Sequence, residues 1–533
     1  MDNTSSPSTA NQQIARAAGT VMVAIVLGQL LGLLRGILVA RAFPASDLDA
    51  YFAANRVSET LFMLIAAGAL GSAFIPTFAG MLAHGDRSAA WRLASSLANL
   101  ILLILSALAL LSAVFAPSIV RHLLAPGFSA RPALFDLTVE LLRIQLASVV
   151  FFGLGGLLVG ILNAHNIFFV PALTPCMYQL GLIFGVVILG PAMGIRGLAW
   201  GVVAGACLYL LLQLPSLFRL SRAGAPASTP VWYTPTFGLR DSSVQEVLRL
   251  MLPRVLGIGV VQLNFWVNTW LASRMQSGSV AGLQYGFSLM LMAQAAIAQS
   301  VAIAAMPTFS AQHSLGRLDE LRGSLAASLR GVLLLSAPAA AGLIILREPI
   351  VALLYQRGQF DAQMTALVSW ALLWYAAGLV GHAMLEVLTR AFYAQHDTMT
   401  PVIVGVFAMG LNVALSFAFA ALFTRIGWMP HGGLALANSV ATALEMGALY
   451  VLMRKRLGAM DGQGVGRGLL HALMGTAVLS AAVVLFSQLE LPAWSAAIGG
   501  VTLGAAAYLI VMRLLRVPEL LAIHASLMRR LRS

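Results

Sequence analysis

Apolar stretches long enough to cross a lipid bilayer follow one another along most of this chain, separated by short breaks that carry proline, glycine or charged residues. A helix needs about 20 predominantly apolar residues to span the hydrocarbon core. Hydrophobic residues make up 59% of the 533 positions and charged residues only 10%, which is too little polar surface for a water-soluble protein of this size. The sequence therefore predicts an all-α polytopic membrane protein.

About fourteen segments are predicted to span the membrane as helices. They fall into two groups of six, with two further segments near the C-terminal end. The predicted ranges are 17–42, 50–82, 90–117, 136–163, 168–192 and 195–220, then 247–274, 281–310, 324–346, 362–391, 399–424 and 432–454, and finally 467–488 and 492–515.

The two groups of six resemble each other in sequence. Four short matches occur in the same order at offsets of 230 to 236 residues, and two of them align Pro76 with Pro307 and Pro171 with Pro401. We interpret the matches as the duplication of a six-helix unit. Since six is even, both copies enter the membrane in the same direction, which predicts a parallel repeat of the kind found in transporters. The four prolines are predicted hinges, although proline is also simply common in membrane helices.

This repeat predicts two lobes, an interlobe linker and two additional helices. The linker is rich in proline, serine and glycine, and the last residues resemble a basic amphipathic helix lying on an anionic membrane surface. The predicted regions are a polar N-terminal segment (1–16), the N-lobe (17–220), the linker (221–246), the C-lobe (247–454), helices 13 and 14 (467–515) and the basic tail (516–533).

Basic residues indicate how the chain is oriented. The formal charge is +13, and with a cytoplasmic N-terminus the inner segments carry twenty arginines and lysines against eight in the outer ones. Cytoplasmic loops are enriched in these residues, so both termini are predicted to be cytoplasmic and the charge needs no nucleic acid partner. Cys176 and Cys207 both lie in apolar runs, which indicates neither a disulfide framework nor a metal site.

Two arginines lie in or next to predicted spans. Arg35 interrupts the apolar run "LGLLRGILVA", where an arginine at a helix centre costs about 2.5–3.5 kcal/mol. It is predicted either to line a polar cavity between the lobes, or to extend outward along the roughly 9 Å that separate it from Arg41. Arg56 is followed at i+3 by Glu59, a spacing that fits a cargo contact or a local ion pair.

The motifs "LGLLRGILVARAF", "DAYFAANRV", "GALGSAFIPTFA", "APGFS", "GILNAHNIFFVPALTP", "SGSVAGLQY" and "FYAQHDTMTPV" resemble the MurJ (MviN) family of lipid II flippases. The resemblance covers nearly the whole chain. It implies fourteen helices, a cationic cavity for a diphosphate-sugar headgroup, a groove along 467–515 for an undecaprenyl tail, and a place in the bacterial cytoplasmic membrane. It also implies a partner lipid linked through undecaprenyl diphosphate, surrounding membrane lipids, and contact with the cell-wall synthesis machinery.

The chain departs from the family at the cavity. Arg35 is retained, but Gln29 stands where the family's first helix has an earlier arginine, and Gly36 stands where an acid follows. Further family positions for an arginine on helix 2, and for an acid and an arginine on helix 8, fall at Phe62, Phe287 and Ser288. Of the family's cavity arginines, the resemblance carries over only Arg35. The candidate headgroup contacts of this chain are Arg35, Gln29 and Arg56.

The coupling ion is the second open point of the resemblance. Some members bind sodium through carboxylates on helices 7 and 11, where this chain has Asn264, Asn412 and Ser416. Glu445 in helix 12 has no cation near it in sequence and is a candidate for ion or proton coupling. We therefore expect the energy to come from the membrane potential or from a gradient of Na⁺ or H⁺, and no other cofactor is expected.

The main hypothesis is a lipid II flippase that works by alternating access and is not an enzyme. No G-x-x-x-x-G-K-[ST] loop occurs, which argues against ATP hydrolysis by the chain itself. The alternatives are a flippase for another polyprenyl-linked oligosaccharide, and a multidrug or cation antiporter on the same scaffold. A membrane enzyme ranks last, because the nine histidines are scattered without ligand spacing.

Overall fold

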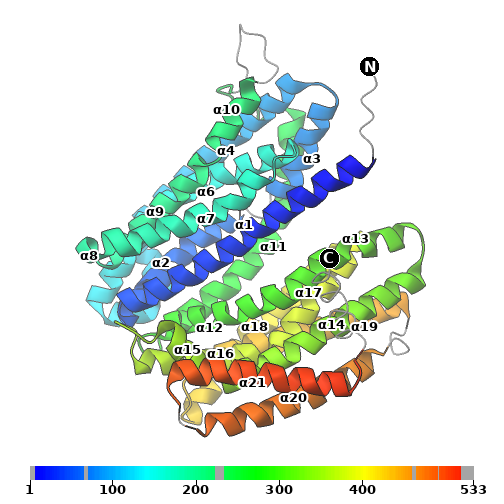
Figure 1. Cartoon of the computed structure of the whole chain (residues 1–533). Coiled ribbons are helices and arrows are strands. Elements are labelled where there is room, and N and C mark those ends of the chain that lie inside the picture. Colours follow the sequence, from blue (N-terminus) through cyan, green and yellow to red (C-terminus); the bar gives the residue numbers. More distant parts are fainter. Residues whose placement is uncertain (1–6, 65–69, 223–232, 459–463, 490, 518–533) are drawn as a thin grey trace. The chain divides into compact units, whose positions relative to one another are not determined.

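The computed structural model describes residues 7–64, 70–222, 233–458, 464–489 and 491–517, and the regular elements in these ranges are all helical. The predicted N-terminal segment lies partly outside the described residues, as do residues 223–232 of the linker and nearly all of the basic tail. The chain divides into two compact units, Met1–Arg274 and Met275–Ser533, whose helices are labelled in Figure 1.

Unit 1 contains nine helices of eight or more residues in its described part, together with shorter turns around residues 116–130 and 185–193. The longer helices are α1 (Pro7–Ala42), α2 (Ala45–Phe62), α3 (Leu70–Ala83), α4 (Arg87–Val114), α6 (Pro132–Ala164), α7 (Phe169–Phe184), α9 (Ile195–Leu211), α10 (Leu214–Arg222) and α11 (Ser242–Ala272).

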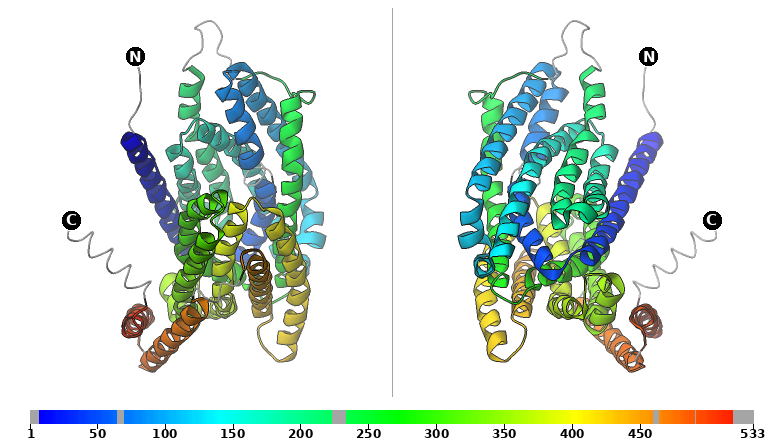
Figure 2. Two further views of the ribbon diagram at one scale, coloured as in Figure 1. Left: turned by 90° about the vertical axis from the view of Figure 1, so that its right-hand side faces the viewer. Right: turned by 90° about the vertical axis from the view of Figure 1, so that its left-hand side faces the viewer.

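Unit 2 is built in the same way and adds a final helix pair, α20 and α21, which lie side by side in Figure 2. Its helices are α12 (Ser279–Gln294), α13 (Ser300–Ser314), α14 (Leu318–Ile345), α15 (Arg347–Tyr355), α16 (Ala362–Ala377), α17 (Leu379–Ala394), α18 (Met399–Arg425), α19 (His431–Leu457), α20 (Val465–Ser487) and α21 (Ala493–Leu514).

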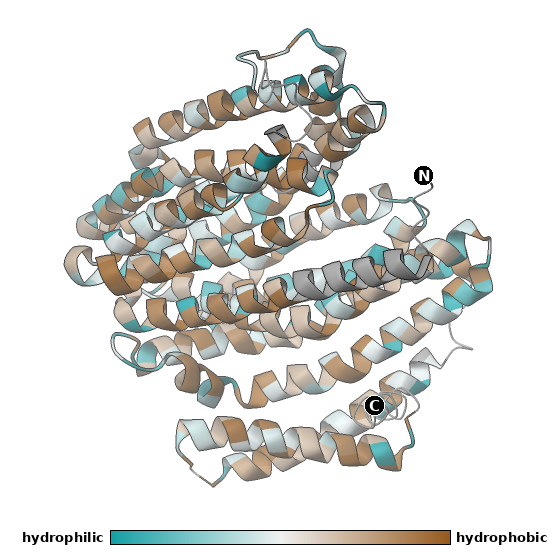
Figure 3. Cartoon of the chain, turned by 45° about the horizontal axis from the view of Figure 1, so that its top comes forward, coloured by the Kyte–Doolittle hydropathy of each residue, from teal (hydrophilic) through white to brown (hydrophobic). Residues whose placement is uncertain are grey.

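Within the described ranges, eleven helices are long and apolar enough to cross a membrane, and the pair α16–α17, bent by 48°, forms a twelfth span if it is counted as one. Many large apolar side chains on these helices are exposed, among them Leu485, Leu509 and Ile510, and Figure 3 shows hydrophobic faces along most of the helices. Extensive exposed apolar surface is unfavourable in water and is expected for helices that face the hydrocarbon of a bilayer. The prediction of an all-α multi-pass membrane protein is confirmed, whereas the count of fourteen spans is not.

The boundary between the units places α11 with unit 1, whereas the sequence assigns this helix to the C-lobe. α11 packs against α2, α3 and α4, and at its end the Ser273 hydroxyl accepts a hydrogen bond from the Gly127 amide at 3.2 Å. The division by contacts therefore falls after α11, while the linker that the sequence places between the lobes lies before it.

Backbone conformation repeats at the same offset as the sequence. Gly85 and Gly316, 231 residues apart, have φ of 79° and 69°, and Asn166 and His396, 230 residues apart, both have φ of 60°. A left-handed backbone is unfavourable for residues other than glycine, so its recurrence at matched positions supports the duplication.

The prolines of the repeat occupy two kinds of position. Pro76 and Pro307 lie inside α3 and α13, where a missing N–H removes an intrahelical hydrogen bond. Pro171 and Pro401 lie in the first turns of α7 and α18, where the N–H has no intrahelical acceptor in any case. Their role as hinges stays a prediction, and only the first pair interrupts a helix.

The α17–α18 turn carries an ion pair that its repeat counterpart lacks, because Ile167 replaces Asp397. Asp397 pairs with Arg456 at the end of α19 and accepts a hydrogen bond from the Thr400 amide at 2.9 Å. Burial by itself raises the pKa of Asp397, but the Thr400 and Arg456 interactions outweigh it and lower the pKa to about 2. The carboxylate therefore stays ionised and fastens this turn to α19.

Helices α7 and α9 approach each other through glycine. Gly181 on α7 and Gly185, the residue that follows α7, face Gly205 and Gly201 on α9, and a Cβ added to Gly181 would lie 2.2 Å from the Cα of Gly205. Small residues spaced by four let membrane helices pack backbone to backbone. This contact has no room for a side chain.

We therefore predict that Gly181→Leu lowers the thermal stability of the detergent-purified protein, since overpacking typically costs about 1–3 kcal/mol. The matched control is Gly410→Leu on α18, where an added Cβ would meet nothing within 4 Å. Equal melting temperatures for the two variants would contradict the close α7–α9 contact.

Candidate functional site

Arg56 and Glu59 on α2 form an ion pair with 3.0 Å between Nη1 and Oε2. The Arg56 side chain is only 11% exposed, and its guanidinium lies 4.9 Å from the ring centroid of Phe265 on α11. A guanidinium over an aromatic face gains cation–π attraction, most strongly where water is excluded. The sequence left open whether Arg56 contacts the cargo or forms a local ion pair. In the structure it forms the ion pair, and it also has an aromatic neighbour, Phe265, that the sequence did not indicate.

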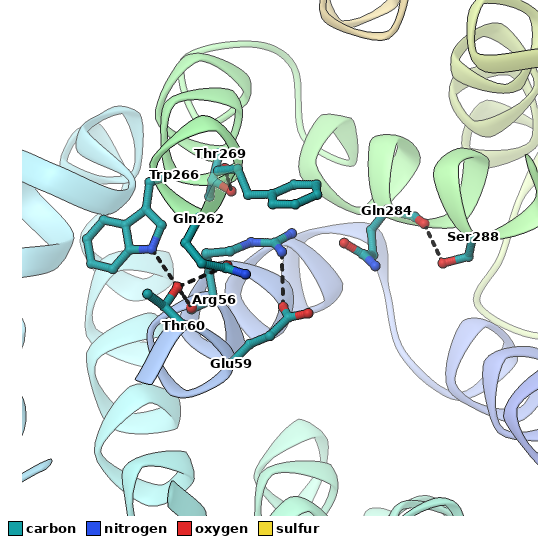
Figure 4. Close-up of polar contacts among 9 residues, drawn as sticks. Arg56, Glu59, Thr60, Gln262, Trp266, Thr269, Gln284 and Ser288 are labelled. Carbon is teal, nitrogen blue, oxygen red and sulfur yellow. Dashed lines mark hydrogen bonds and ion pairs between the residues drawn. The ribbon is translucent and has the colours of Figure 1, made fainter. Parts of the chain in front are cut away.

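A hydrogen-bond network joins α2 to α11 beside this pair (Figure 4). The indole N–H of Trp266 donates to the Thr60 hydroxyl at 2.8 Å, and that hydroxyl donates to the Arg56 carbonyl at 2.7 Å. The buried Gln262 side chain lies 3.4 Å from the same hydroxyl. The position of Arg56 is thus fixed from both helices.

Arg35 on α1 is half-buried and interacts electrostatically with Tyr51 on α2 and Tyr178 on α7. Glu59 acts on the same two tyrosines, so the four side chains share one region of unit 1. The Nε of Arg35 is enclosed and has no hydrogen-bond partner among the residues that the structure describes. Arg35 therefore lies in a part of unit 1 that contains two tyrosines and an acid.

α7 is held close to α1 at this point. A Cβ added to Gly32, one turn before Arg35, would lie 3.3 Å from Nε2 of Gln179, and one added to Gly28 would lie 3.7 Å from the sulfur of Cys176. The two glycines allow α7 to pack close to α1, and Tyr178 of α7 interacts electrostatically with the arginine. Gln29, by contrast, is exposed, and the structure gives it no contact with Arg35.

The residues predicted for ion coupling are distributed over both units. Asn264 and Asn268 lie one turn apart on α11 in unit 1, with 3.4 Å between their side-chain atoms. Asn412 and Ser416 lie on α18 in unit 2, both fully buried, with 3.2 Å between hydroxyl and amide oxygen. Within the described ranges, no three or more His, Cys, Asp or Glu side chains form a group that could hold a metal ion.

Glu445 lies on α19 in unit 2, against the backbone of α18. A Cβ added to Gly405 would lie 3.2 Å from Oε1 of Glu445. In the same unit, the His382 ring on α17 lies 3.0 Å from the Asn438 amide oxygen on α19. Glu445 and this His–Asn pair are polar groups on the sides of α19 that face α18 and α17.

Sequence reasoning missed Tyr51, Tyr178, Thr60, Gln262 and Trp266. The i,i+4 spacings Arg56–Thr60 and Gln262–Trp266 place each pair on one helix face. The sequence could therefore have predicted each pair by itself. Nothing in the sequence joined the two faces, because more than two hundred residues separate Thr60 from Trp266.

Comparison with known proteins yields one consistent family. The family model described as lipid II flippase MurJ matches residues 39–499. The lipid II flippase MurJ of Burkholderia cenocepacia is 31% identical over 83% of this chain and 84% of its own length. The probable lipid II flippase MurJ of Vibrio cholerae is 29% identical over 83% of both chains.

Solved structures agree with the sequence matches. Lipid II flippase MurJ in an inward closed conformation has a TM-score of 0.77 at 25% identity, covering 93% of this chain and 98% of its own. An inward-facing multidrug resistance MATE family transporter of the MOP superfamily has a TM-score of 0.68 at 17% identity, over 84% of this chain and 99% of its own. At that identity the second likeness shows the fold alone.

The α2–α11 network generates a testable prediction. Trp266→Phe and Thr60→Val each remove one side of a hydrogen bond and should each destabilise the purified protein by about 0.5–1.5 kcal/mol. The double variant should lose less free energy of unfolding than the two single variants together, because both substitutions delete the same hydrogen bond. Thermal unfolding of the two single variants and the double variant measures this coupling, and strictly additive shifts would show that the two side chains do not interact.

Proposed function

The chain belongs to the MurJ family of lipid II flippases, and on that premise we propose that it moves lipid II from the inner to the outer leaflet of the bacterial cytoplasmic membrane by alternating access. The observation that carries the proposal is the agreement of the family match with the curated relatives over most of the chain. In the proposed orientation both termini are cytoplasmic. The lipid's undecaprenyl tail would lie along the apolar surfaces of α20 and α21, and the cell-wall synthesis machinery would be a partner.

Arg35 is the proposed headgroup contact. A guanidinium binds phosphate oxygens through paired N–H donors, and such charge-assisted bonds are strongest away from water. The hydroxyls of Tyr51 and Tyr178 near Arg35 supply further donors for phosphate or sugar oxygens. Arg56 is already paired with Glu59, so a diphosphate would reach it only in competition with that carboxylate. Gln29 is the weakest of the three proposed contacts.

We predict that the native chain restores growth of a strain depleted of its own lipid II flippase and that Arg35→Ala, expressed at the same level, does not. Losing hydrogen bonds to a charged group costs about 1.5–3 kcal/mol, which corresponds to roughly 10- to 100-fold weaker headgroup binding. The control is Arg317→Ala, an exposed arginine paired with Glu320 outside the site.

The growth results test the flippase function and the role of Arg35 separately. Growth with Arg35→Ala would leave the flippase assignment intact and remove Arg35 from the headgroup site. Failure of the native chain despite confirmed membrane insertion would contradict lipid II as the cargo. Purified protein in vesicles would then be compared on lipid II and on another polyprenyl-diphosphate oligosaccharide, and translocation of the second alone would identify the alternative flippase.

Orientation is tested by labelling single cysteines with a membrane-impermeant thiol reagent. In a background with Cys176→Ala and Cys207→Ala, Ser88→Cys before the body of α4 should react only from the cytoplasmic side. Ile426→Cys after α18 should react only from outside. Both positions are exposed, so accessibility does not limit the reaction. The reverse pattern would overturn the proposed topology.

A further inference from the structure

Glu445 lies near the middle of α19, on the same face as Asn438 and Thr442. These three residues follow one another at spacings of four and three, which places them along one stripe of the helix. Asn438 and Thr442 are buried, and Glu445 is half-buried against α18. Polar side chains therefore follow one face of α19 for roughly 10 Å, from Asn438, which contacts His382, to the carboxylate of Glu445.

The helices packed against α19 offer few charged partners for this carboxylate. The only titratable side chain of α18 is Arg425 at its last residue, while α16 and α12 contribute only Tyr375 and Tyr285. On α17, Tyr393 interacts electrostatically with Glu445 and with the Glu386–Arg390 pair, and His382 bonds Asn438. α14 carries arginines, of which Arg322 bonds the Leu457 carbonyl at the last residue of α19.

Arg390 on α17 already forms an ion pair with an acid other than Glu445. Its Nη2 lies 2.9 Å from Oε1 of Glu386, so the charge of this cation on α17 is neutralised by another acid. In the part of the chain that the structure describes, Glu445 has neither an ion pair nor a hydrogen bond. An acidic side chain placed in this way inside a membrane span is costly and marks a functional position.

We propose that Glu445 is the proton-binding group of unit 2, binding one proton and releasing it in each transport cycle. Binding converts the carboxylate to a neutral carboxylic acid, and release restores the negative charge. His382, Asn438 and Thr442 provide the polar side along which the proton is exchanged. This inference rests on the proposed function, because it makes the proton the ion that drives lipid translocation.

A proton suits this position better than a metal ion does. A single basic oxygen binds a proton, whereas a metal ion needs several ligands, and the neighbour on α18 is a glycine backbone. Neutralising the carboxylate also removes the charge that would resist movement of α19 through a low-dielectric environment. The protonation state and the conformation of unit 2 are therefore linked.

Proton binding is tested first, without transport. Infrared difference spectra of the purified full chain in lipid nanodiscs are recorded through a pH titration, for the native protein and for Glu445→Gln. A protonated-carboxyl band that titrates in the native chain and is missing from Glu445→Gln supports the proposal, while identical spectra overturn it. Glu320→Gln, which alters an exposed acid of the same unit, should keep the native band.

Translocation of lipid II in proteoliposomes is then measured under an imposed pH gradient or an imposed sodium gradient, with the membrane potential clamped at zero. We expect a pH gradient to accelerate the native chain and Glu320→Gln, and Glu445→Gln to keep only the rate seen without a gradient. Acceleration of Glu445→Gln equal to native, or acceleration by sodium alone, overturns the proposal. Failure of the native chain to translocate lipid II contradicts the proposed function, and the infrared result decides on Glu445 independently.

Discussion

Inside a membrane, each charged side chain has to be met by another part of the protein, because hydrocarbon offers no hydrogen bonds in place of water. The ion pair between Arg56 and Glu59, with Phe265 over the guanidinium, meets this requirement in unit 1. The pair between Glu386 and Arg390 meets it in unit 2. Arg35 and Glu445 form no ion pair among the described residues, and they are the two residues to which we assign a ligand in the proposals above.

Close packing of α7 against α1 and α9 places the α7 side chains near Arg35. Tyr178 and Gln179 belong to α7, which rests on α9 through glycines, and a Cβ on Gly205 would lie 2.7 Å from the Tyr178 carbonyl oxygen. The other side of α7 meets α1 at Gly28 and Gly32. Backbone contact on one side therefore determines which side chains reach the arginine on the other.

The two copies of the repeat carry different chemistry on the same scaffold. At an offset of 231, Phe287 and Met290 stand where unit 1 has Arg56 and Glu59, so unit 2 lacks the counterpart of that pair. At the offset of 236 found near the end of the repeat, Tyr209 stands in place of Glu445. Turns and prolines are retained while the charged residues differ, so the scaffold is shared by the two copies and the chemistry is not.

Sequence by itself determined the membrane class, the all-α fold and the family, because these depend on hydropathy and on motifs along one chain. The Arg56–Glu59 pair could also be predicted, since its members lie one helical turn apart. Tertiary structure alone decided that Trp266 reaches Thr60, that Tyr51 and Tyr178 lie near Arg35, and that Glu445 faces a glycine and not a cation. These contacts join helices far apart in the chain, and helix packing, not local spacing, selects them.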